Sequence, residues 1–132
     1  MVKSMGCQYV LCGHSERRTL FNDSDLSINR KVAKVLDAGM RPILCVGETK
    51  SEYELDIKNE VCALQLSKDL LGVTKAQMKN VVIAYEPVWA IGTGLVCGAK
   101  DAGEVTNNGP YQNYFSNVLC THYSDYALHF SF

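Results

Sequence analysis

The chain has 132 residues, of which 47% are apolar and 20% charged, and its formal net charge is −1. This composition is typical of a soluble globular domain and excludes a disordered chain, because enough apolar surface is present to offset the entropy lost on folding. The balanced charge excludes a nucleic-acid binder that works by bulk charge. No apolar run reaches the roughly 18 residues of a membrane span, and no secretory leader pattern is visible.

Three short apolar runs predict β-strands at residues 9–12, 42–46 and 81–85. Continuous apolar runs are typical of strands that are buried on both faces of a parallel sheet. A helix is predicted between the first two strands, with a cap at Asp23 or Ser24 and an end at Gly39.

A longer helix is predicted between the second and third strands. Ser51 and Glu54 fit a capping box at its start, and Gly72 fits its end. Its inward-facing stripe is predicted to be Ile57, Val61 and Leu64. The resulting βαβαβ order requires either an open doubly wound sheet or part of a (β/α) barrel. Both architectures place functional residues at the carboxyl ends of the strands.

The composition changes near residue 105. Every Lys and Arg lies at or before Lys100, whereas residues 106–132 carry one charged side chain, Asp125, and seven of the twelve aromatic residues. We therefore expect a domain over residues 1–105 and a divergent tail over 106–132. The tail is either a loop followed by an aromatic strand or a segment foreign to the domain.

Six cysteines are spread along the chain without CxxC spacing, so the usual zinc and redox-pair patterns are missing. Cys12 and Cys45 lie inside apolar runs and are expected to be small buried hydrophobes. The even count leaves disulfides open, but reduced thiols of a cytosolic type are the expectation for a chain that can build a core without them. No motif implies a metal or organic cofactor.

Two side chains at the strand ends could carry acid–base chemistry. His14 follows the first strand and opens a turn toward a helix, where the backbone disfavours a positive imidazole, so a neutral ring could donate to a substrate carbonyl. Glu86 ends the third strand, and apolar neighbours that exclude water would strengthen it as a base. The alternatives are a structural histidine and a carboxylate that caps the next turn. Together the pair suits proton abstraction beside a carbonyl.

The segment 87–97 looks like a hinged lid, because Pro87 and Trp89 precede a glycine-bearing turn at Gly92. That turn is only a weak match to a phosphate-binding loop. Arg18 is expected to belong to a solvated, salt-bridged turn.

Three strings carry a resemblance to a known family: YVLCGHSERR (9–18), ILCVGET (43–49) and AYEPVWAIGTG (84–94). They closely resemble triosephosphate isomerase, and the resemblance spans roughly residues 1–105. It implies an α/β fold that is part of a (β/α)8 TIM barrel, with the equivalents of strands four to six and their helices.

The resemblance also implies roles, in a family that is itself a well-known example of this chemistry. Glu86 would be the base that shuttles the proton, His14 the neutral electrophile, and the backbone N–H of Gly92 a phosphate ligand. The implied site-organising residues are Glu16, Cys45 and Glu48. The implied lid comprises Pro87, Val88, Trp89, Ala90, Ile91, Gly92, Thr93 and Gly94, with Tyr85 and Trp89 positioning it.

The implied reaction interconverts glyceraldehyde 3-phosphate and dihydroxyacetone phosphate through an enediolate, in glycolysis and gluconeogenesis. The implied partner is a small phosphorylated triose, without cofactor, nucleic acid or membrane. The family is homodimeric, but its dimerising loop has no counterpart here. The expected location is cytoplasmic, with the plastid as the alternative. A three-stranded sheet would leave both edges open, so we expect a fragment that is inactive or nearly so alone. The alternative is a truncated, non-catalytic paralogue that binds phosphate ligands or regulates.

Overall fold

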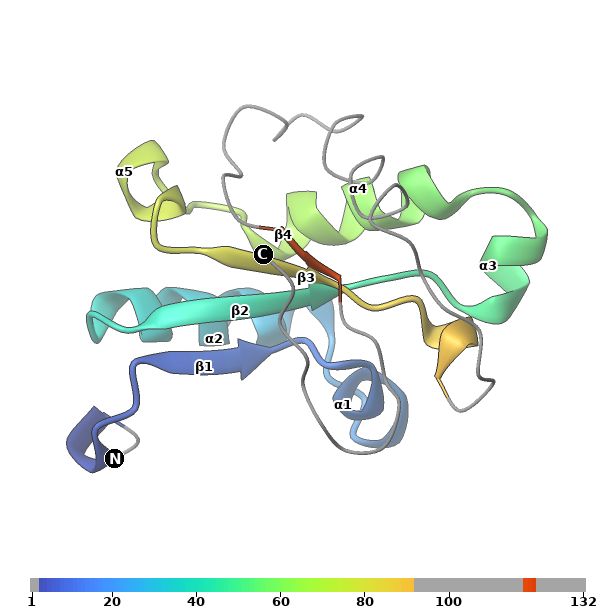
Figure 1. Ribbon diagram of the computed structural model, residues 1–132. Coiled ribbons are helices and arrows are strands. Elements are labelled where there is room, and N and C mark those ends of the chain that lie inside the picture. The colour runs from blue at the N-terminus through green and yellow to red at the C-terminus, as the bar shows by residue number, and fades with distance from the viewer. Residues whose placement is uncertain (1–2, 92–117, 121–132) are drawn as a thin grey trace.

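The computed structural model describes residues 3–91 and the backbone of residues 118–120. These residues form a four-stranded parallel sheet in the order β1-β2-β3-β4, with helices in the connections (Figure 1). The strands are β1 (Tyr9–Cys12), β2 (Arg41–Val46), β3 (Val82–Tyr85) and β4 (Val118–Cys120). The helices are η1 (Lys3–Met5), α1 (Ser15–Leu20), α2 (Asp25–Asp37), α3 (Lys50–Glu54), α4 (Lys58–Asp69), α5 (Lys75–Met78) and η2 (Val88–Ala90).

The three predicted strands are all present and run parallel. Cys12 of β1 lies opposite Leu44 of β2, and Cys45 lies opposite Ala84 of β3, so the three carboxyl ends meet at one edge of the sheet. The expectation that both sheet edges are open is wrong at β3, because residues 118–120 pair with it in parallel. These residues come from the predicted tail, whereas the expected boundary near residue 105 lies outside the described residues.

The helix expected between β1 and β2 is confirmed as α2. The Ser24 side chain accepts the backbone N–H of Ser27, which satisfies one of the unpaired donors at the helix start. The short helix α1, which the sequence did not reveal, precedes it and begins directly after His14.

The helix expected between β2 and β3 is wrong in its details. It is divided into α3 and α4 by Asp56, whose φ of 56° is left-handed. The capping box is formed by Thr49 and Glu52 at the start of α3, rather than by Ser51 and Glu54.

The break at Asp56 also changes which side chains of α4 face inward. Because α4 begins only at Lys58, Cys62 and Leu66 are buried, whereas Leu64 is 55% exposed. The predicted stripe through Leu64 is therefore wrong. Another short helix, α5, follows with its own capping box of Thr74 and Gln77.

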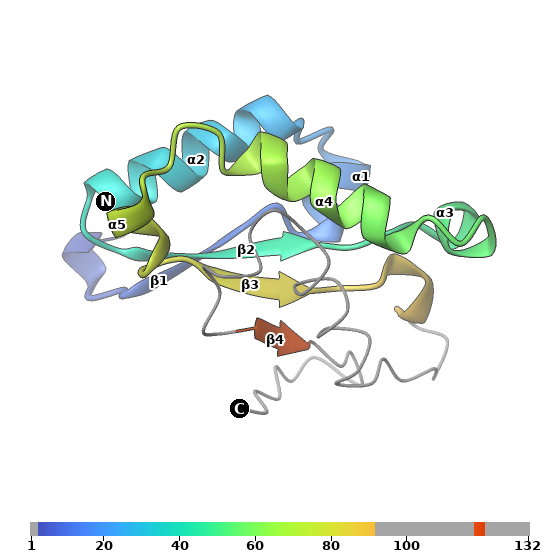
Figure 2. The same ribbon diagram turned by 90° about the horizontal axis from the view of Figure 1, so that it is seen from above.

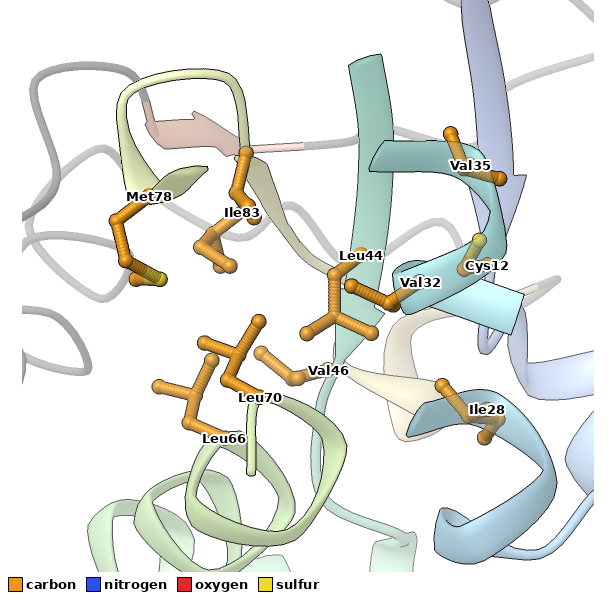
Figure 3. Close-up of a cluster of buried hydrophobic side chains, with 11 residues drawn as sticks. Cys12, Ile28, Val32, Val35, Leu44, Val46, Leu66, Leu70, Met78 and Ile83 are labelled. Atoms are coloured by element: carbon orange, nitrogen blue, oxygen red, sulfur yellow. The ribbon is translucent and has the colours of Figure 1, made fainter. Parts of the chain in front are cut away.

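The core lies between the sheet and the two long helices, which cover the same face of the sheet (Figure 2). Side chains from α2, α4 and the strands meet there (Figure 3). The buried cluster comprises Cys12, Ile28, Val32, Val35, Leu44, Val46, Leu66, Leu70, Met78, Val81 and Ile83. Within the described part of the chain, no helix is long and apolar enough to cross a membrane.

Candidate active site

The carboxyl ends of β1 and β3 bring His14 and Glu86 into contact. His14 is the N-cap of α1, and its Nδ1 accepts the backbone N–H of Glu16 at 3.3 Å. An accepting Nδ1 carries no proton, so the ring proton of the neutral imidazole is on Nε2. Nε2 lies 3.1 Å from Oε1 of Glu86. The imidazole thus directs its N–H at the carboxylate, in the tautomer that could donate to a carbonyl.

Glu86 is held in a buried position, with 3% of its surface exposed. The Ser15 hydroxyl donates to Oε1 at 2.8 Å, and the Ser15 backbone N–H donates to Oε2 at 3.4 Å. The start of α1 thus presents hydrogen-bond donors to the carboxylate. Ser15 is a contact of the site that sequence reasoning missed, because the helix that it begins, α1, was not predicted.

The backbone at the end of β2 lies directly against Glu86. The Glu86 N–H donates to the Val46 carbonyl at 2.8 Å. A Cβ on Gly47 would lie 1.9 Å from the Glu86 carbonyl oxygen, so only glycine fits there. Gln65 of α4 fixes this glycine twice, because its Oε1 accepts the Gly47 N–H at 2.9 Å and its Nε2 donates to the Gly47 carbonyl at 3.3 Å.

Glu48 lies next to this contact and is completely buried. Its carboxylate accepts the Tyr85 hydroxyl at 2.9 and 3.0 Å and the Trp89 indole N–H at 2.7 Å. The Trp89 ring also stacks on Tyr53, with centroids 4.4 Å apart. Glu48 therefore ties the end of β3 to the start of the segment that follows it.

That segment is the expected lid, and the structure describes its first part. Pro87 is buried, and residues 88–90 form η2, whose first residue, Val88, donates its backbone N–H to the Glu48 carbonyl at 3.0 Å. Ile91 follows in a turn. The remaining predicted lid residues, Gly92, Thr93 and Gly94, lie outside the described residues.

Cys45 and Glu16 occupy different environments near this pair. Cys45 is buried, as expected, and its burial together with the neighbouring Glu86 charge raises the pKa of the thiol. A raised pKa keeps the thiol protonated, so it is a small apolar neighbour of Glu86 rather than a nucleophile. Glu16 is exposed on α1, and its backbone N–H is what reaches His14.

Arg18 differs from its expected place in a solvated turn, because only 18% of its side chain is exposed. Its guanidinium donates to the Gly13 carbonyl at 2.8 Å and to the Cys45 carbonyl at 3.1 Å. It also pairs with Asp25 at 2.9 Å and with Asp69 at 2.7 Å. The sequence could not show this, because the four partners come from four separate segments.

An open cleft of about 100 Å³ borders Glu86, and its lining also includes Ser15, Gly47 and Gln65, whereas His14 is not one of the lining residues. The arrangement therefore places an imidazole N–H donor beside a buried carboxylate, and that carboxylate borders open space. These are the parts that proton abstraction beside a carbonyl needs.

Comparison with known proteins gives this site a context. The family model described as Triosephosphate isomerase matches residues 1–109. The triosephosphate isomerase of Clostridium novyi (strain NT) is 47% identical over 104 residues, which are 79% of this chain and 42% of that protein. That of Mycoplasmoides gallisepticum is 52% identical over 101 residues, covering 76% of this chain and 40% of its own length.

The triosephosphate isomerase of Syntrophotalea carbinolica is 54% identical over 94 residues, or 71% of this chain and 37% of that protein. The chain thus spans about two fifths of the length of these relatives. The family match covers the strands β1 to β3, the helices between them and both residues of the His14–Glu86 contact. The chain belongs to the triosephosphate isomerase family.

Proposed function

We propose that this chain carries the proton-transfer pair of a triosephosphate isomerase, which interconverts glyceraldehyde 3-phosphate and dihydroxyacetone phosphate. Glu86 is the base, and His14 is the hydrogen-bond donor to the substrate carbonyl. The observation that carries this proposal is the contact of 3.1 Å between Nε2 of His14 and Oε1 of the buried Glu86. The two groups lie at strand ends, where parallel α/β folds place their catalytic residues.

The geometry suggests how the reaction would begin. The His14 N–H and the Ser15 hydroxyl both point at Glu86. A substrate carbonyl oxygen would accept the hydrogen bond from the His14 N–H in place of Glu86. The Glu86 carboxylate could then turn toward the carbon next to the carbonyl. Glu86 would then remove a proton from that carbon, and the electrons would form an enediolate stabilised by the His14 N–H. A proton would pass from the hydroxyl on this carbon to the oxygen of the former carbonyl. Glu86 would return its proton to the neighbouring carbon as the new carbonyl forms.

We further propose that β1, β2 and β3 are the equivalents of the fourth, fifth and sixth strands of an eight-stranded barrel. In the described residues β1 has no neighbour on its outer edge, and Tyr9 and Leu11 are each 47% exposed. A site in such an open sheet holds a substrate weakly, and catalysis depends on binding remote from the reacting carbon. We therefore expect the chain alone to turn over slowly, more than about a hundredfold below complete relatives.

The test is a coupled isomerase assay on the purified chain with glyceraldehyde 3-phosphate. Glu86→Gln removes the base and keeps the side-chain size, and Glu54→Gln is a matched change at an exposed glutamate of α3. Slow turnover that disappears in Glu86→Gln and persists in Glu54→Gln is expected. If the folded chain converts substrate no faster than Glu86→Gln, the catalytic proposal is wrong, and a module that only binds phosphate ligands takes its place. Turnover equal to that of complete relatives would refute the slow rate.

A further inference from the structure

We propose that Asp69 is a positioning residue which, by pairing with Arg18 inside the protein, fixes the two strand ends beside His14 and Glu86. This inference rests on the proposed function, since it concerns the same site. Asp69 is the last residue of α4 and touches neither His14 nor Glu86 in any described contact. Its influence would pass through Arg18.

The arginine connects the two strand ends directly. Its Nε donates to the carbonyl of Gly13 at the end of β1, and its Nη2 donates to the carbonyl of Cys45 in β2. Gly13 immediately precedes His14, and Cys45 is two residues before Gly47, whose backbone lies against Glu86. The absence of a side chain at Gly13 leaves room for the guanidinium, because a Cβ there would lie 2.8 Å from Nη2 of Arg18. A shift of the guanidinium would therefore move the backbone on both sides of the catalytic pair.

Asp69 determines where the guanidinium lies. Its Oδ2 accepts the same Nη2 at 2.7 Å, and its side chain is fully buried, so the pair is shielded from water. Its backbone carbonyl is fixed in turn, because the Asn29 amide donates to it at 2.9 Å. The other oxygen, Oδ1, is buried with no hydrogen-bond partner among the described residues.

The titratable and charged groups near Asp69 come from three elements. They are Arg18 from α1, Asp25 from α2 and the Cys12 thiol from β1, and Lys68, its neighbour on α4, pairs with Asp25 at 3.4 Å. Burial raises the pKa of Asp69 to about 7, and Arg18 opposes this rise only in part. The charge that holds Arg18 is therefore complete only above neutral pH. Protonation of Asp69 weakens the pair by removing its charge-assisted hydrogen bond.

The test uses NMR of the isotope-labelled chain and measures no turnover, so it can fail or succeed independently of the proposed isomerase activity. The signal followed is that of Arg18 Nε–H, whose acceptor is Gly13, between pH 5 and 9. We expect a transition with a midpoint near 7 in the unmodified chain and none in Asp69→Asn. Because both proteins retain His14, the difference belongs to Asp69. An Arg18 Nε–H signal that is the same at pH 9 in Asp69→Asn and in the unmodified chain would overturn the proposal.

A matched variant separates positioning from general destabilisation. Asp25→Asn changes the other carboxylate that pairs with the Arg18 guanidinium. The Asp25 side chain is 28% exposed, and it accepts from Nη1 rather than from Nη2. The backbone amide signals of residues 13–15 and 45–47 should shift at least about threefold more in Asp69→Asn than in Asp25→Asn. Equal shifts in the two variants would show that Asp69 does not place the strand ends.

Discussion

Replacing Gly47 by alanine tests the close contact between the end of β2 and the backbone of Glu86. Gly47 has no left-handed φ, so an alanine there meets no backbone strain of that kind. The whole effect of Gly47→Ala should therefore come from the added methyl group.

The size of the effect follows from the distances. The new Cβ would lie 1.9 Å from the Glu86 carbonyl oxygen and 2.6 Å from its carbon, whereas real contacts begin at 3.0 to 3.4 Å. The two backbones must therefore separate by about 1.1 to 1.5 Å (3.0 − 1.9 and 3.4 − 1.9). Overpacking of this kind costs about 1–3 kcal/mol of stability. A displacement of about 1 Å at a catalytic group can cost on the order of a hundredfold in rate.

Urea denaturation and the ¹⁵N spectrum of the chain measure these two effects. The control is Gly72→Ala, because Gly72 has a φ of +80° but open space around its Cβ position. The control should lose about 1 kcal/mol through backbone strain alone and leave the signals of Ser15 and Glu86 in place. A Gly47→Ala protein that is as stable as the unmodified chain, with unmoved signals at Ser15 and Glu86, would refute the reasoning.

Three further predictions concern the core, the lid and pH. Leu66→Ala should lower the free energy of unfolding, measured by urea titration, by about 2–5 kcal/mol, because Leu66 is buried. Leu64→Ala, at an exposed position, should change it by less than about 0.5 kcal/mol. Equal losses in the two variants would show that Leu64 faces inward, as the sequence predicted. Glu48→Gln replaces an acceptor oxygen with a donor, so the single tryptophan, Trp89, should gain mobility and its fluorescence anisotropy should fall. Unchanged anisotropy would contradict the conclusion that Glu48 holds Trp89 in place. Because the pKa of Asp69 is raised to about 7, the stability that it contributes is present below about pH 4 and is lost as the pH rises to 7, by at most about 1.4 kcal/mol per pH unit. The stability of the chain relative to Asp69→Asn should therefore fall over that range, and a constant difference would exclude the raised pKa.

Local patterns were enough to predict much of the fold. Apolar runs predicted the strands β1, β2 and β3. The expected burial on both faces is confirmed for β3, whereas it is wrong for β1, an edge strand in which Tyr9 and Leu11 are exposed. Ser24 marked the start of α2, because its hydroxyl satisfies a free N–H of the first turn. The division of the second helix was missed, because the left-handed Asp56 has a conformation that its residue type permits but does not require. Leu64 was then assigned to the wrong face.

Some residues of the candidate site could also be predicted from the sequence, whereas the contacts between them could not. His14 and Glu86 could be chosen from the sequence because each directly follows a predicted strand, and the resemblance to a family supported the choice. The contacts of Ser15 and Gly47 with Glu86 could not be predicted, because they depend on distances between segments that are far apart in the chain. The burial of Arg18 depends on four such segments at once.

The most direct test of the central proposal is the exchange of solvent deuterium into dihydroxyacetone phosphate, followed by proton NMR in D₂O. It detects removal of the proton by Glu86 even if product forms slowly. If Glu86 is the base, the unmodified chain should cause loss of a carbon-bound proton signal at a rate above that of Glu86→Gln at equal protein concentration. Equal exchange rates for the two folded proteins would show that Glu86 does not act as the base in this chain.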